Sequence, residues 1–111
     1  MSERLQIPAY VKAADDKYVI VNTDDAPKKK ALMERGFEEH KNGDFHRMVE
    51  NAEKKALVLE DLRDLGFAFS VGPGWSPSEV FEDLRDRNLL QGCYKRLSWT
   101  GPKQFHITED C

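Results

Sequence analysis

The chain has 111 residues and is short of cysteine and of long apolar runs. No stretch approaches the roughly 20 apolar residues that a helix needs to cross a bilayer. The first residues, "MSERLQIPAYVKAADDK", include no apolar segment of the signal-peptide type. Two cysteines, Cys93 and Cys111, are fewer than a small secreted domain stapled by disulfides usually carries. These absences predict a cytoplasmic protein without a membrane span, in which Cys93 is a buried thiol.

The chain also lacks the motifs that accompany common catalytic and metal-binding chemistry. No pair of cysteines or histidines has the spacing of a structural zinc site. No G-x-S-x-G segment is present to form a nucleophile elbow. The segment "VGPGW" (71–75) lacks the lysine of a phosphate-binding loop and the third glycine of a dinucleotide fingerprint. The sequence therefore predicts a protein that is not an enzyme and that holds neither a metal nor a cofactor.

The composition that remains is that of one globular domain. Hydrophobic residues make up 40% of the chain and charged residues 33%, and the net charge is −3. A chain of this size can bury a core without staples, so we take 1–111 as a single domain. The segment from Asn88 to Thr108 differs from the rest because it has no Asp or Glu, although it carries Lys95, Arg96 and Lys103. The mild acidity of the whole chain disfavours extensive contact with nucleic acid.

Periodicity and turn signals predict the order of the first elements. A β-branched run predicts a strand over Lys17–Asn22. Two helices are expected, one from a cap at Asp24 or Asp25 to Gly36, the other over "ENAEKKALVLEDLRDL" (50–65), ended by Gly66. Each helix therefore ends at a glycine followed by a phenylalanine. The segment "FAFSV" (67–71) alternates as a half-buried strand does.

A β-hairpin is expected between these two helices, because Asn42-Gly43 is a strong two-residue turn signal. A turn at these residues gives a register in which most facing pairs are complementary in charge or apolar. The expected pairs are Lys41 with Asp44, His40 with Phe45, Glu39 with His46, Glu38 with Arg47, and Phe37 with Met48. This register places His40 and His46 on opposite faces of the hairpin, so they are not expected to share a metal ion.

Two further elements complete the chain. A third helix is expected from an N-cap at Ser76, with Glu79 completing a capping box, to an end at Gly92. A final hairpin is expected to pair Cys93–Trp99 with Lys103–Thr108. The sequence thus predicts an α+β fold, a ferredoxin-like βαββαβ core extended by the third helix and the C-terminal β-hairpin. Residues 1–16 are expected to form an irregular N-terminal arm.

The order of elements resembles that of the RNA-recognition motif, whose central strands stack bases on aromatic side chains. The first expected strand has one aromatic residue, Tyr18, and the strand after the Asn-Gly turn also has one, Phe45. Neither strand fits the glycine–aromatic pattern of that family. The resemblance is therefore limited to the order of elements.

Alternation along the C-terminal hairpin separates its side chains into two faces. One face holds Cys93, Leu97, Trp99, Phe105 and Ile107 and is expected to be mainly core, although Lys95 lies on it too, so it is not expected to be wholly buried. The other is expected to face outward and to bind a partner through Tyr94, Arg96, Gln104 and His106, with Lys103 at the tip. We predict a small non-enzymatic regulatory protein that docks onto a protein partner through this face. The alternative is a nucleic-acid-binding module that uses the same basic and aromatic hairpin.

Overall fold

The computed structural model describes residues 9–15, 17–72, 75–101 and 104–110, and it has a mixed α+β fold. The described helices are α1 (Ala26–Glu34), α2 (Ala52–Asp64) and α3 (Pro77–Asp86), with a short 3-10 turn at Lys41–Gly43. The strands are β1 (Tyr10–Ala14), β2 (Tyr18–Asn22), β3 (Glu38–Glu39), β4 (Asp44–Met48), β5 (Ala68–Ser70), β6 (Tyr94–Gly101) and β7 (Gln104–Asp110).

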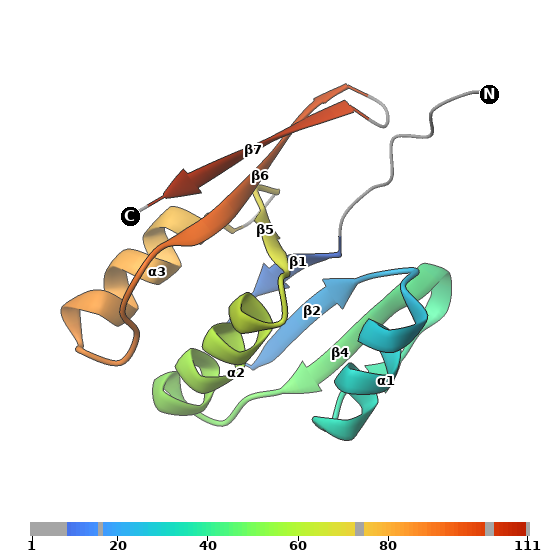
Figure 1. The fold of residues 1–111 in the computed structure, drawn as a ribbon. Coiled ribbons are helices and arrows are strands. Elements are labelled where there is room, and N and C mark those ends of the chain that lie inside the picture. Colours follow the sequence, from blue (N-terminus) through green and yellow to red (C-terminus); the bar gives the residue numbers. More distant parts are fainter. Residues whose placement is uncertain (1–8, 16, 73–74, 102–103, 111) are drawn as a thin grey trace.

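All of these strands belong to one seven-stranded sheet in the order β3-β4-β2-β1-β5-β6-β7 (Figure 1). Two pairings, β1 with β5 and β5 with β6, are parallel. The other pairings are antiparallel. The sheet therefore combines a four-stranded antiparallel part (β3-β4-β2-β1) with the antiparallel β6–β7 hairpin, and short parallel pairings join the two through β5, which is only three residues long.

The elements from β2 to β5 follow the predicted order, but a ferredoxin-like core is not confirmed. Strand β1 lies between β2 and β5 and makes a ladder with each of them. The expectation of an irregular arm over 1–16 is therefore wrong for Tyr10–Ala14, which forms an interior strand of the sheet. Residues 1–8 and 16 lie outside the described part of the chain.

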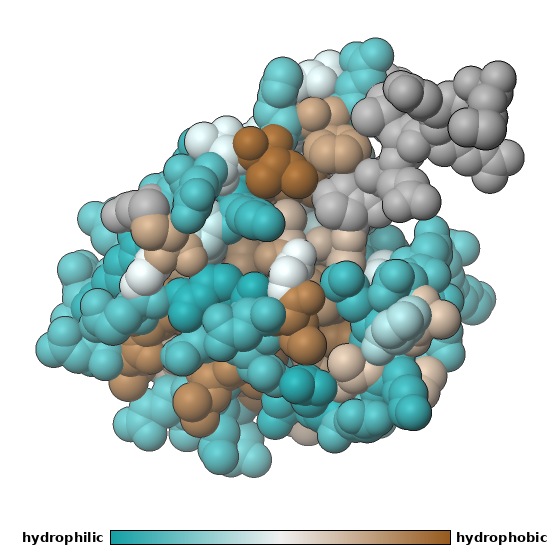
Figure 2. Space-filling view, in the orientation of Figure 1, coloured by the Kyte–Doolittle hydropathy of each residue, from teal (hydrophilic) through white to brown (hydrophobic). Residues whose placement is uncertain are grey.

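The core lies between the helices and one face of the sheet. The ladder register places Phe45, Val21, Val11 and Phe69 in one row across four strands. These four side chains are fully buried and belong to one cluster that also includes buried residues of all three helices. In the view of Figure 1, α1 and α2 lie on either side of β2 and β4, and α3 lies beside β6. In Figure 2, the same view of the surface is mostly hydrophilic, with hydrophobic side chains scattered among polar ones.

Helices α1 and α2 end as the sequence predicts. Gly36 and Gly66 have φ angles of 86° and 93°, the left-handed conformation that favours glycine. The amide of Phe37 donates to Leu32 O, and that of Phe67 donates to Leu62 O, both at 3.0 Å. Each phenylalanine is buried directly after the helix, so both helix ends are fixed to the core.

Helix α3 differs from prediction at both ends. Ser76 is the N-cap residue, but its side chain makes no capping hydrogen bond, so the expected capping box does not form. The helix stops at Asp86, and Asn88, with φ 57°, takes the left-handed position assigned to Gly92. The amide of Leu89 then donates to Leu84 O at 2.9 Å, which closes the helix as in α1 and α2.

The Asn42-Gly43 turn forms, but the predicted hairpin register is wrong by one residue. Asn42 and Gly43 have φ angles of 62° and 79°, as a type I′ turn requires. Lys41 is an extra residue on the β3 side, because the amide of His40 donates to Asp44 O at 2.7 Å. In the observed register, Glu38 faces His46 and Glu39 faces Phe45.

A contact from β2 explains the shift in register. The side-chain amide of Asn22 donates to Asn42 O at 3.0 Å and to Asp44 Oδ1 at 2.7 Å. These bonds hold both ends of the turn against β2. Cross-strand pairs contribute only about 0.2–1 kcal/mol each, so the pairs that favour the predicted register do not outweigh this tertiary contact.

Cys93 is half-buried and disulfide-bonded, so the expectation of a buried thiol is wrong. Cys111, the other cysteine of the chain, lies outside the described residues. Disulfides are typical of oxidising compartments, so the cysteines give no support to the cytoplasmic location expected from the sequence. Among the helices described, none has the length and apolar character needed to cross a membrane.

Candidate functional site

The C-terminal hairpin alternates as predicted and Leu97 is buried as expected, but the expected burial is wrong for Tyr94 and Trp99. Tyr94 is only 2% exposed and lies in the core, not on an outer face. Its ring stacks on Phe81 of α3 with 3.9 Å between ring centroids, and it contacts the edge of Phe69. The Tyr94 hydroxyl lies 3.0 Å from Asp110 Oδ2, to which it donates, and burial raises the pKa of this tyrosine. Tyr94 therefore holds α3 onto the sheet and is not available to a partner.

The other predicted binding residues that the structure describes lie on the same face of the hairpin as Tyr94 but differ in their exposure. Arg96 is half-buried, and its guanidinium donates to Asp110 Oδ2 and to Ser78 Oγ, each at 3.2 Å. Gln104 and His106 are exposed on β7, and Lys103 lies outside the described residues. Among the described members of this set, Gln104 and His106 are therefore exposed, Arg96 is partly exposed but ion-paired, and Tyr94 is buried.

The opposite face of the sheet is the surface that the prediction missed. The strand registers place Tyr10, Ile20, His46, Ser70, Leu97 and Trp99 on this face. No helix among the described residues packs there, and we call it the helix-free face. Four of its large side chains are exposed: Met48 (67%), Ile107 (45%), Tyr18 (43%) and Trp99 (38%).

Trp99 is held in a fixed orientation on the helix-free face. Its indole Nε1 donates to Ser70 Oγ at 2.9 Å. The edges of its ring system contact Tyr10, at 5.6 Å between centroids, and Phe105, at 6.0 Å. More than a third of Trp99 nevertheless stays open to solvent. A large aromatic ring that is both oriented and exposed is typical of the anchors of protein interfaces.

A polar cluster lies on the same face, where β1, β2 and β4 meet. Lys12 Nζ lies 3.0 Å from Asp44 Oδ2, and Asn22 donates to the other carboxylate oxygen. Burial opposes ionisation of Asp44, but the hydrogen bonds from Asn22 and Lys12 outweigh it and lower the pKa of this carboxyl group. Burial raises the pKa of Tyr10 nearby. The lysine and the aspartate compensate each other, so this part of the face has no excess charge.

His40 and His46 stack on each other next to this cluster, with 3.8 Å between ring centroids and 19° between ring planes. They share the helix-free face, because the extra residue in the hairpin reverses the side on which His40 lies. Burial and the neighbouring His40 lower the pKa of His46. The argument that opposite faces prevent a shared metal ion is therefore wrong. Within the described residues, no group of three or more His, Cys, Asp or Glu side chains is arranged to hold an ion.

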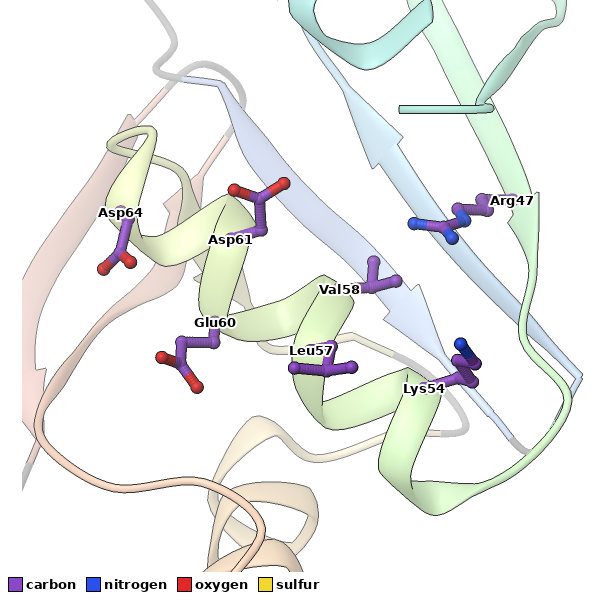
Figure 3. A pocket seen from close by; sticks show the side chains of 7 residues that line it. All are labelled: Arg47, Lys54, Leu57, Val58, Glu60, Asp61 and Asp64. Atoms are coloured by element: carbon purple, nitrogen blue, oxygen red, sulfur yellow. The ribbon is translucent and has the colours of Figure 1, made fainter. Parts of the chain in front are cut away.

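A shallow groove of about 380 Å³ lies on the helix side, between α2 and β4. Figure 3 shows Arg47 and Lys54 at one end of it, Leu57 and Val58 in the middle, and Glu60, Asp61 and Asp64 toward the other end. Asp61 is paired with Arg35, and Asp64 lies 3.7 Å from Arg63. The groove has no nucleophile with an adjacent base, so its residues cannot be given roles in a reaction.

The sequence contains a signal for strand β1, which places Tyr10 on the sheet and was missed in the prediction. The Tyr-Val pair at Tyr10 recurs at Tyr18, and a polar segment with Asp15 separates the two. Asp15 Oδ1 accepts hydrogen bonds from the amides of Lys17 and Tyr18, both at 2.7 Å, which makes it the turn residue of a β1–β2 hairpin. These backbone bonds lower the pKa of Asp15. Two similar runs around an Asp-containing turn are a hairpin pattern that predicts Tyr10 on the sheet.

Comparison of the chain with protein-family models, with curated proteins and with solved structures finds no match.

Proposed function

We propose that this chain is a non-enzymatic binding protein that docks a protein partner on the helix-free face of its sheet, with Trp99 as the anchor. The observation that carries the proposal is the fixed but exposed indole of Trp99, braced by two aromatic rings and a serine hydroxyl. Such an anchor loses little conformational entropy on binding and offers a large apolar area. The exposed side chains of Tyr18, Met48 and Ile107 extend this contact area over the same face.

A protein partner is favoured over a nucleic acid by the charges of the face. Lys12 is paired with Asp44, and Lys95 faces Glu109 across the β6–β7 ladder. Binding to a phosphate backbone relies on cations that are free to displace counterions. Here each of these two lysines has a carboxylate opposite it, and the net charge of the whole chain is −3. The expected partner therefore presents an apolar surface with few charges opposite Trp99.

Trp99→Ala tests the proposal. The native chain is used to capture partners from its source cells, and the affinity for the recovered partner is then measured. We expect Trp99→Ala to weaken this binding by about 30-fold, which corresponds to a hot spot of about 2 kcal/mol. Tyr18→Ala should weaken it less, because Tyr18 is exposed on the same face but makes no ring contact with another described aromatic.

Leu57→Ala is the matched control, because Leu57 is 61% exposed but lies on α2, on the other side of the molecule. It should bind the partner as the native chain does. Thermal melting of each variant separates a loss of binding from a loss of fold. Equal binding by Trp99→Ala and the native chain would reject the docking face. Loss of capture after nuclease treatment, with an affinity that falls steeply with salt, would instead establish the nucleic-acid alternative.

A further inference from the structure

β7 (Gln104–Asp110) is an edge of the sheet that the fold leaves unprotected. It pairs with β6 on one side, and no described strand lies along its other side. The opposite edge, β3, is only two residues long and consists of two exposed glutamates, whereas β7 has seven residues. Short or charged edges resist pairing with another chain, and long ones invite it. We propose that β7 pairs antiparallel with β7 of a second copy of this chain and joins the two sheets into one.

The sequence of β7 is complementary to itself in this arrangement. A two-fold axis at Ile107 places this residue opposite its own copy and pairs the whole strand. The remaining facing pairs are His106 with Thr108, Phe105 with Glu109, and Gln104 with Asp110. No carboxylate faces another carboxylate. Moving the axis to Glu109 would place two glutamates opposite each other, which is unfavourable in a sheet.

The acidic end of β7 does not oppose this pairing, because its charges are already compensated within each chain. Glu109 faces Lys95 across the β6–β7 ladder. Asp110 Oδ2 accepts from the Tyr94 hydroxyl at 3.0 Å and from the Arg96 guanidinium at 3.2 Å. A second copy therefore meets an edge with little net negative charge. Self-pairing of β3 would instead bring together four glutamates from two copies, Glu38 and Glu39 of each.

The pairing also covers apolar surface that the single chain exposes. Ile107 is 45% exposed although it lies on the edge strand of the sheet. On the axis, each Ile107 would pack against the other, with Phe105 and Trp99 of both copies flanking them on the same face. Two helix-free faces would then form one continuous surface. This self-association does not depend on the proposed protein partner, and the two are measured separately.

Sedimentation of the full chain over a range of concentrations tests the proposal. The native chain should approach twice the 12.8 kDa of a single chain as concentration rises. Ile107→Lys would place two ammonium groups opposite each other, so it should raise the dissociation constant of the dimer by more than about tenfold. Tyr18→Lys is the matched control. Tyr18 has nearly the same exposure, but three strands separate β2 from β7, so this variant should dimerise like the native chain.

Mixing charges provides a positive test of the register. Ile107→Lys and Ile107→Glu should each be monomeric alone and should form a heterodimer when mixed in equal amounts, because a lysine then faces a glutamate. Melting curves like that of the native chain establish that both variants fold. A native chain that stays monomeric at all concentrations would overturn the proposal. So would a mixture that stays monomeric, a dimer that Tyr18→Lys also abolishes, or a dimer that persists as a covalent species on a non-reducing denaturing gel.

Discussion

The burial of Tyr94 is an example of a property that the neighbouring residues in the sequence do not predict. The alternation along β6 and β7 correctly separates Tyr94 and Arg96 from Leu97 and Trp99. Which of these sides faces the core depends on where α3 packs, and Phe81 of α3 stacks on Tyr94. That contact joins residues 13 positions apart, and no local pattern contains it. Loss of binding on truncating Tyr94 would therefore report unfolding, not a partner surface.

Two features of the structure favour glycine at position 43. Its φ of 79° favours glycine, and a Cβ at this position would lie 3.0 Å from Thr23 O and 3.2 Å from Asp24 Oδ1. We expect Gly43→Ala to lower the free energy of unfolding by more than the about 1–2 kcal/mol of left-handed strain alone, as measured by urea denaturation.

Gly66→Ala is the control for this prediction. Gly66 has a similar φ of 93°, but nothing lies within 4 Å of its Cβ position. Gly66→Ala should lower the free energy of unfolding only by the contribution of left-handed backbone strain. If the two variants lose the same stability, the backbone contact at Thr23 has no energetic weight.

At the scale of elements, the ends of α1 and α2 are the most predictable feature. The glycines that end α1 and α2 and the caps near their starts are local signals, because each acts within about one helical turn. Asp25 and Asn51 are the N-caps, and their side chains accept from the amides of Lys28 and Lys54. The start of α3 shows the limit of such signals. Ser76 occupies the N-cap position but makes no side-chain capping bond.

The N-cap residues of α2 and α3, Asn51 and Ser76, lead to different expectations for substitution by alanine. Asn51 Oδ1 accepts from the Lys54 amide at 2.8 Å, so Asn51→Ala should destabilise the protein by about 1 kcal/mol. Ser76→Ala removes no such bond and should change the denaturation midpoint little. A loss of about 1 kcal/mol in Ser76→Ala would mean that the hydroxyl caps α3 in solution.

For the whole molecule, the sequence predicts most of the elements, but neither strand β1 nor the order of the strands. Strands β2 and β4 and the three helices follow from periodicity and turns, which are local. The position of β1 between β2 and β5 follows from the local hairpin pairing of Val11 with Val21 and from the long-range pairing of Val11 with Phe69. The helix-free face depends on this order, because it brings Tyr10 beside Trp99. The candidate site was therefore less predictable than the elements that carry it.

The paired histidines connect the fold of the whole molecule to pH. The pKa of His46 lies below its ordinary value of 6.5, chiefly through burial and then through His40, while Asp44 acts in the opposite direction. Lys12 further lowers this pKa, and Glu38, which faces His46, raises it. Between the lowered pKa and 6.5, the unfolded chain binds a proton at this histidine more readily than the folded chain does. The stability that His46 contributes is therefore complete above pH 6.5 and is lost as pH falls below it.

We expect the melting temperature of the native chain to fall between pH 7.5 and pH 5.5 by more than that of His46→Gln, in which this proton cannot bind. His106→Gln is the matched control, because His106 is exposed on β7, on the other face of the sheet from the histidine pair. It should keep the pH dependence of the native chain. If the melting temperatures of the native chain and His46→Gln fall by the same amount across this pH range, the stacked histidines do not couple protonation to folding. The aspartates with lowered pKa do not blur the result, because their contribution is lost only as pH falls below about 3.8, outside this range.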